Sequence, residues 1–167
     1  MRWSHVARLL LTCGAIAGLC ACVSFTPEDL KPEARRAAIA AAAPAEVVAV
    51  ATNNAPEFLY VNGQSKEVDL DGFSKVLATL VADSLRASGV GIEVGGRPIS
   101  LQVAWLDFMF QGPCIVDYNV VLGENEPFGQ QSKGRGGNLE KACRLAFEAA
   151  SDQILRDVRT VRYLEEK

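Results

Sequence analysis

The sequence predicts an α+β domain, in which an antiparallel or mixed sheet of three to five strands is packed by two amphipathic helices. Two observations lead to this fold class. Apolar and polar residues alternate over 99–110 and 114–122, as in strands with one covered face. Apolar residues recur at helical spacing over 73–88 and 139–158. A hydrophobic content of 49% with 22% charged residues fits a globular domain and excludes disordered and polytopic membrane proteins.

The first predicted elements are a strand and a hairpin. Residues 47–51 form a run of Val and Ala that is closed by two asparagines. Residues 58–61 and 66–70 then flank Asn62-Gly63, a dipeptide that favours two-residue hairpin turns.

A helix and a long strand follow. Asp71 is the expected N-cap of the helix over 73–88, and Gly89 is its expected end. In the strand over 99–110, the phase of the alternation reverses near Trp105. This reversal predicts either a β-bulge that re-aims the strand there or a strand end that is covered on both faces, and the bulge is the more economical of the two.

The second long strand, 114–122, should pair antiparallel with the first, and 128–133 should add a short polar strand at the edge. Asn138 is the expected cap of the last helix, 139–158. The tail 161–164 is β-prone and is predicted to dock on the sheet.

The N-terminus has the layout of an export signal. Arg2 and Arg8 precede an apolar run that is too short to span a membrane, so a retained transmembrane helix is the weaker alternative. Residues 19–22, with the sequence LCAC, resemble the lipobox of bacterial lipoproteins. The resemblance implies that residues 1–21 are removed and that Cys22 carries acyl chains such as palmitate. An ordinary secreted protein is the alternative.

Three segments are therefore predicted: a lipoprotein signal peptide over 1–21, a lipidated N-terminus with an Ala- and Pro-rich tether over 22–46, and one periplasmic domain over 47–167. The tether is expected to be a partly helical spacer, with a docked first helix as the alternative. The residue after the acceptor cysteine is Val23 and not Asp, which by resemblance to lipoproteins implies the outer membrane.

Composition limits the chemistry. The only histidine, His5, lies in the predicted signal, so the mature chain has no Ser-His or Cys-His pair and no zinc site built on histidine. A formal net charge of -3 is not that of a general nucleic-acid binder. No metal or cofactor is expected.

Cys114 and Cys143 are the two cysteines that lie outside the signal and the lipid site. In an oxidising compartment they are a candidate disulfide that would join a central strand to the last helix. Two buried free thiols are the alternative.

A glycine-rich segment precedes the last helix and is a candidate anion-binding site. Backbone N–H groups, the helix dipole and two cations would converge there on a phosphate such as that of a lipid headgroup. The alternative is a simple connection. The candidate residues are Lys133, Gly134, Arg135, Gly136, Gly137 and Asn138.

Other side chains have weaker claims to a function. Carboxylates at Asp69 and Asp71, and at Glu124 and Glu126, lie in turns where they are normally solvated. The aromatic residues of the central strands are expected to line the core or a groove. These are Trp105, Phe108, Phe110 and Tyr118.

The order of elements from 73 to 164 resembles that of small envelope lipoproteins of the YajG type and, more loosely, the auxiliary lipoproteins of transport systems. The shared pattern is a helix (73–88), two strands (99–110 and 115–122) and a closing helix (139–158). The resemblance implies a non-enzymatic accessory protein that is tethered in the periplasm.

Three functions are carried forward. The first is a non-catalytic, lipid-anchored protein of the outer membrane that binds a partner protein or an envelope amphiphile through its sheet or a groove. The second is a hydrolase of cell-wall or lipid substrates that uses Asp107 or Asp117. The third is a structural lipoprotein that bridges membrane and peptidoglycan.

Overall fold

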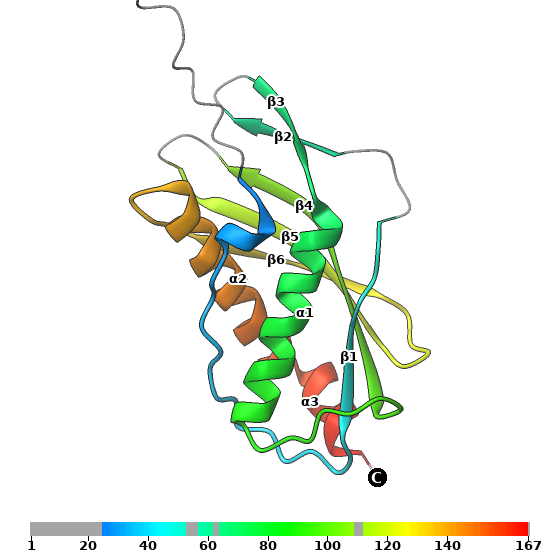
Figure 1. Ribbon diagram of the computed structural model, residues 1–167. Coiled ribbons are helices and arrows are strands. Elements are labelled where there is room, and N and C mark those ends of the chain that lie inside the picture. Colours follow the sequence, from blue (N-terminus) through cyan, green and yellow to red (C-terminus); the bar gives the residue numbers. More distant parts are fainter. Residues whose placement is uncertain (1–24, 53–56, 62–63, 109–111, 167) are drawn as a thin grey trace, which may run out of the picture.

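The computed structural model describes residues 25–52, 57–61, 64–108 and 112–166, with the backbone alone over 57–61 and 64–67. It confirms the expected α+β fold, because helices pack on one face of a four-stranded sheet (Figure 1). Along the chain the elements are η1 (Pro27–Asp29), β1 (Ala45–Ala49), β2 (Glu57–Val61), β3 (Gln64–Val68), α1 (Leu70–Ala87), β4 (Arg97–Phe108), β5 (Cys114–Leu122), β6 (Phe128–Gly134), α2 (Leu139–Arg156) and α3 (Val158–Glu165).

The sheet is mixed and has the strand order β1-β4-β5-β6. β1 pairs parallel with β4, from Ala45 opposite Arg97 to Ala49 opposite Leu101. The β4–β5 and β5–β6 pairs are antiparallel. The predicted hairpin is present as β2 and β3, which form a separate two-stranded sheet. The hairpin and α1 lie in the connection between β1 and β4.

Helix α1 begins one turn earlier than predicted. Its N-cap is Asp69, whose carboxylate accepts a hydrogen bond from the Gly72 amide at 2.7 Å. Asp71, the cap that we expected, lies in the first turn of the helix. It accepts bonds from the amide and hydroxyl of Thr52 at 2.6 and 2.9 Å. Either carboxylate is suited to a helix N-terminus. Because Thr52 bonds to Asp71, the capping position is left to Asp69.

The reversal near Trp105 is a β-bulge, as predicted. Val103 lies opposite Tyr118 and Trp105 lies opposite Asp117, so that Ala104 is the extra residue. The bulge keeps apolar side chains directed at the helices along the whole of β4.

The C-terminal tail differs from the prediction, because 161–164 lies in α3 and not in a strand. Helix α2 begins after Asn138, as expected, and ends at Arg156, because the next residue, Asp157, has an extended ψ of 128°. The carboxylate of Asp157 then caps α3 by accepting a bond from the Arg159 amide at 2.9 Å. In the helix, the side chain of Leu164 faces the core and is completely buried. A strand at this position would not need to bury Leu164 completely.

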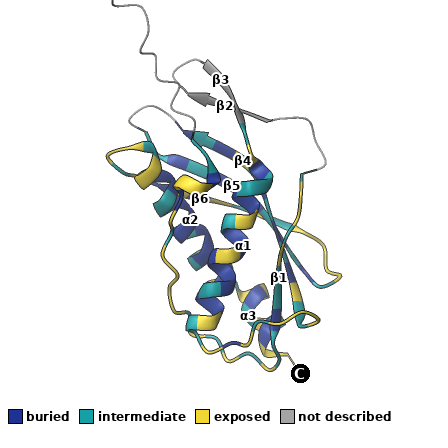
Figure 2. Ribbon diagram, viewed as in Figure 1, coloured by how far each residue is buried: buried dark blue, intermediate teal, exposed yellow. Residues whose placement is uncertain are grey.

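The core lies between the sheet and the helices (Figure 2). Its largest completely buried side chains come from all layers and include Phe73 of α1, Tyr118 of β5 and Phe147 of α2. The predicted disulfide is present in this core, where Cys114 of β5 bonds to Cys143 of α2.

Residues 25–44, here called the strap, differ from the expected spacer. They contain one short 3-10 turn, η1, and otherwise run without a helix along α1 and α2 toward β1 (Figure 1). Leu30 is buried, and Ile39 packs against the core. Alanine favours a helix, but Pro27, Pro32 and Pro44 interrupt the run and helices already formed offer partners for its backbone.

No helix in the described residues is long and apolar enough to cross a membrane.

Candidate functional site

The sheet has one covered face and one open face. Side chains of β4 and β5 that point toward the helices are buried, whereas those that point the other way are all partly or fully exposed. We call the second set, with its neighbours on β1 and β6, the open face. Its residues are Val48, Ser100, Gln102, Trp105, Asp107, Ile115, Asp117, Asn119, Val121, Gln131 and Lys133.

Trp105 is the most prominent apolar side chain of the open face. It is 44% exposed although it lies on a central strand. The bulge explains this position, because without the extra residue the alternation that buries Val103 would also bury Trp105. We had expected Trp105 to line the core or a groove, as Phe108 and Tyr118 do. Phe110 lies outside the described residues.

Polar side chains on the open face are joined across the strands. The amide of Asn119 donates to Gln102 at 3.2 Å, and that of Gln131 donates to Asp117 at 2.7 Å. These bonds link side chains of β4 to β5 and of β5 to β6 on the face that carries Trp105, and Asp117 lies directly opposite Trp105. The open face therefore combines an exposed aromatic ring with ordered hydrogen-bonding groups, a composition typical of protein interfaces.

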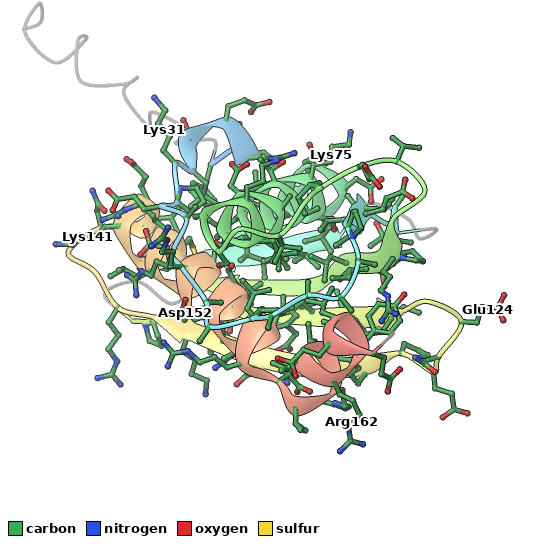
Figure 3. The ribbon with its side chains drawn as sticks, turned by 90° about the horizontal axis from the view of Figure 1, so that it is seen from below. Lys31, Lys75, Glu124, Lys141, Asp152 and Arg162 are labelled. Atoms are coloured by element: carbon green, nitrogen blue, oxygen red, sulfur yellow. A yellow bond between two sulfur atoms is a disulfide. The ribbon has the colours of Figure 1, made fainter. Side chains whose placement is uncertain are left out.

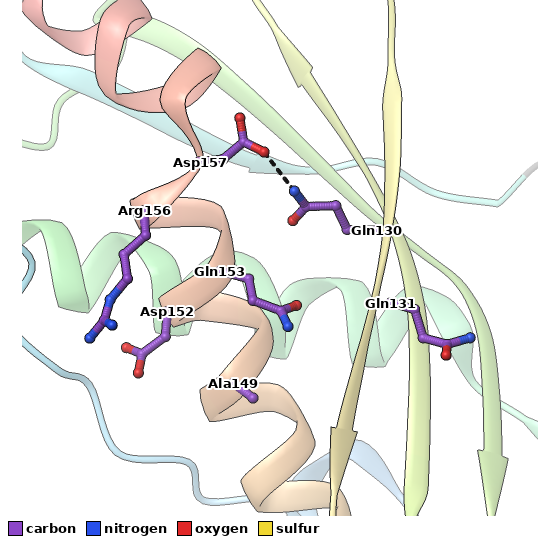
Figure 4. Close-up of a pocket in the computed structure, with 7 residues that line it drawn as sticks. All are labelled: Gln130, Gln131, Ala149, Asp152, Gln153, Arg156 and Asp157. Carbon is purple, nitrogen blue, oxygen red and sulfur yellow. Dashed lines mark hydrogen bonds between the residues drawn. The ribbon is translucent and has the colours of Figure 1, made fainter.

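A polar pocket of about 590 Å³ lies elsewhere, between α2 and β6 (Figure 4). The amide of Gln130 reaches across it and donates to Asp157 at 2.6 Å. The lining residues are Gln130, Gln131, Ala149, Asp152, Gln153, Arg156 and Asp157.

Tyr118 lies beneath this pocket and is 1% exposed. Its hydroxyl is 2.9 Å from the side-chain oxygens of Gln130 and Gln153, and it has one proton to donate between them. Burial raises the pKa of the Tyr118 phenol, and the negative charge of Asp157 raises it further. The phenol is therefore neutral over the physiological range.

Asp157 is the charged group of this network. The bonds that it accepts from the Arg159 side chain, at 2.7 and 2.9 Å, are the main reason why the pKa of its carboxyl lies below the usual value. The Arg159 guanidinium in turn lies 3.5 Å from the centre of the Phe128 ring. The network consequently fixes the junction of α2, α3 and β6.

The sequence did not point to this network. Gln130, Gln153 and Asp157 come from β6, α2 and the start of α3, and amide residues carry no spacing signal for such a meeting. Only the alternation that buries Tyr118, a residue with a polar end, indicated that a hydrogen-bond partner must lie nearby.

The residues of the candidate anion-binding site do not share one face, because β6 continues into the segment as far as Gly134. Lys133 and Arg135 are exposed, whereas Gly134 between them is buried against α2. The last position of the segment, Asn138, accepts a bond from the Lys141 amide at 2.8 Å and so already caps the helix.

The glycines of that segment have a packing role. A Cβ at Gly136 would lie 2.7 Å from the Ala142 nitrogen, and one at Gly134 would overlap the backbone of α2, whereas Gly137 has no neighbour within 4 Å. Close approach of β6 to α2 accounts for the first two.

The other residues that the sequence singled out are not among those that line the pocket or form the glycine-rich segment. Cys22 and the signal lie outside the described residues. Asp107 and Asp117 both lie on the open face, on adjacent strands, where Asp107 is opposite Ile115 and Asp117 is opposite Trp105. Within the described ranges, no group of three or more His, Cys, Asp or Glu side chains is arranged to hold a metal ion.

Comparison with known proteins gives little. No family model matches the sequence, and no curated protein is significantly similar to it. Among solved structures, protein XCC0632 from Xanthomonas campestris, of the family DUF330, is similar with a TM-score of 0.49 and 14% sequence identity. The similarity covers 80% of this chain and 92% of that chain.

Proposed function

We propose that this protein is a non-catalytic accessory lipoprotein of the bacterial envelope. Acyl chains on Cys22 hold it on the outer membrane, facing the periplasm, and the open face binds a partner protein. The exposure of Trp105 in the middle of an ordered polar sheet face is the observation that supports binding.

The solvated face of an antiparallel sheet is normally polar. A tryptophan on a central strand is costly there, because its ring leaves a large apolar area in water. Ile115 and Val121 are also partly exposed on the open face, and Gln102 and Asn119 present hydrogen-bonding groups between them. A partner of mixed apolar and polar surface would cover this area and stabilise it.

Photo-crosslinking in cells tests the proposal. A photoreactive amino acid at Gln102 should capture one defined envelope protein, and Trp105→Ala should weaken binding of that protein at least about tenfold, as loss of a buried aromatic anchor does. Capture of a lipid in place of a protein would favour the envelope amphiphile as ligand.

Val94 provides the matched control. It is 93% exposed in the turn before β4 and lies outside the open face. Probes at Gln102 and at Val94 that capture the same species with equal yield would contradict the proposal. Incorporation of labelled fatty acid that persists in Cys22→Ala would remove the anchor.

The two alternatives have separate tests. Hydrolysis of peptidoglycan by the purified protein, lost in Asp107→Asn, would identify a hydrolase. Retention on isolated sacculi with no protein captured at Gln102 would identify a structural bridge between membrane and peptidoglycan.

A further inference from the structure

The strap connects the predicted lipid anchor to the domain, and its contacts determine how far apart the two can be. If residues 23–44 were a free spacer, a fully extended chain would let β1 move up to roughly 80 Å from Cys22. Because the strap is docked from Phe25 onward, only Val23 and Ser24 separate the anchor from the folded domain, which makes three Cα–Cα steps from Cys22 to Phe25. They span at most about 11 Å.

The docking of the strap begins at Phe25. Its ring stacks on that of Phe73 in α1 with 5.4 Å between the ring centres. Two residues later, Pro27 is buried and starts η1, whose end residue Asp29 accepts bonds from the amide and hydroxyl of Thr26. The point closest to the anchor is therefore a folded part of the molecule.

A charged contact holds the middle of the strap. Glu148 of α2 is 3% exposed and accepts bonds from the Arg35 guanidinium at 2.9 Å, from Arg144 at 3.0 Å and from the Glu33 amide at 3.2 Å. On the other side, the hydroxyls of Ser84 and Ser88 accept bonds from the strap amides of residues 35 and 37. We call the contact of Arg35 with Glu148 the latch.

The strap also determines which end of the molecule lies near the anchor. The η1 end holds the β2–β3 hairpin and the start of α2, whereas α3 and the C-terminus lie at the opposite end (Figure 1). Exposed cations Lys133, Arg135 and Lys141 surround the start of α2, with Glu140 beside them.

Exposed charges differ between the two sides of the molecule. Lys31 and Lys141 lie on one side, and Glu124 lies on the other (Figure 3). Glu124 and Glu126 are both exposed in the turn between β5 and β6. Near the anchor, four exposed acids balance the four cations, whereas the turn between β5 and β6 has two exposed acids and no cation, so anionic headgroups would repel that turn more than the start of α2. The acids near the anchor are Glu28, Asp29, Glu33 and Glu140, and the cations are Lys31, Lys133, Arg135 and Lys141.

We infer that the docked strap seats the domain directly on the phospholipid headgroups of the membrane that holds its anchor, with the start of α2 toward the lipid and the turn at Glu124 away from it. The inference rests on the proposed anchor at Cys22. It adds an orientation and a contact surface, both of which depend on the docked strap.

A distance measurement in vesicles tests this orientation. Full-length lipidated protein carrying Lys141→Cys or Glu124→Cys is labelled with a fluorophore and reconstituted in vesicles of phosphatidylethanolamine and phosphatidylglycerol that contain a headgroup quencher. Labelling is specific because the other cysteines of the mature chain are bridged or lipidated. We expect quenching at residue 141 to exceed that at residue 124 by at least about threefold.

The double variant Phe25→Ala, Arg35→Glu should abolish this difference, because it removes both the stacking of Phe25 on Phe73 next to the anchor and the latch in the middle of the strap. Arg162→Glu, which makes the same change of charge on exposed α3, should leave the difference intact. Equal quenching at both positions with the latch intact would overturn the inference.

Flotation with the vesicles before the measurement separates two kinds of failure. Protein that does not float lacks the anchor, which overturns the proposed function and with it the orientation. Protein that floats but shows equal quenching overturns the orientation alone.

Discussion

The phenol of Tyr118 connects three elements at the level of a single residue. Its hydroxyl lies within hydrogen-bonding distance of Gln130 on β6 and of Gln153 on α2, and burial with the charge of Asp157 raises its pKa. A raised pKa means that the folded protein holds this proton more tightly than the unfolded chain does. The stabilisation is complete below the ordinary tyrosine pKa of about 10 and is lost as the pH rises above it.

We therefore expect the free energy of unfolding to fall more steeply above pH 10 in the native protein than in Tyr118→Phe. Urea denaturation at a series of pH values measures it. Tyr163→Phe is the control, since burial also raises the pKa of Tyr163 but the charge of Arg97 opposes that rise. Identical slopes for the native protein and Tyr118→Phe would contradict the expectation.

At the scale of secondary-structure elements, β6 approaches the backbone of α2 closely at Gly134. A Cβ there would overlap the Ala142 carbonyl and the Ala146 nitrogen and would lie 2.8 Å from the Leu145 carbonyl carbon. These are backbone atoms of a helix that Cys143 ties to β5, so they have little freedom to move.

Gly134→Ala should consequently destabilise the protein by on the order of 3 kcal/mol, because α2 must shift from the sheet. Gly137→Ala is the matched control. Its Cβ would have no neighbour within 4 Å, and its effect should stay within about 0.5 kcal/mol. Thermal or denaturant unfolding of both variants measures the difference, and equal stabilities would refute the packing role of Gly134.

The elements that the sequence predicted correctly have local causes. The strands predicted before and after Asn62-Gly63 pair as β2 and β3, the reversal of alternation at Trp105 is a bulge, and Asn138 caps α2. Each of these signals involves residues within a few positions of one another. The α+β class follows from their order.

Elements that differed from the prediction depend on distant partners. The strap has little to bury by itself, and its partner Glu148 is 113 residues from Arg35. The β-prone tail is helical because Asp157 caps it and Leu164 reaches the core. In the same way, the alternation over 99–105 assigns Trp105 to the covered face with Ile99 and Val103, and only the pairing with β5, which sets the exact place of the bulge, puts it on the open face.

On the scale of the whole molecule, the disulfide joins the sheet to the helical layer. Cys114 and Cys143 are 29 residues apart and both completely buried. Closing a loop of this size restricts the unfolded chain, and the loop entropy corresponds to about 3 to 4 kcal/mol of stability.

Reducing agent should lower the free energy of unfolding by about this amount, and only after the protein opens, because the sulfurs are shielded from solvent. Denaturation with and without dithiothreitol measures the change. A Cys114→Ala, Cys143→Ala double variant should be insensitive to dithiothreitol. Equal sensitivity of this variant would assign the effect to something other than the bridge.

The strap also imposes an order on the completion of the fold. It is the most N-terminal of the described segments, yet its latch cannot form until Glu148, 113 residues after Arg35, has been synthesised. The Arg35 contact of this early segment therefore forms only after one of the last elements of the chain, α2, is available.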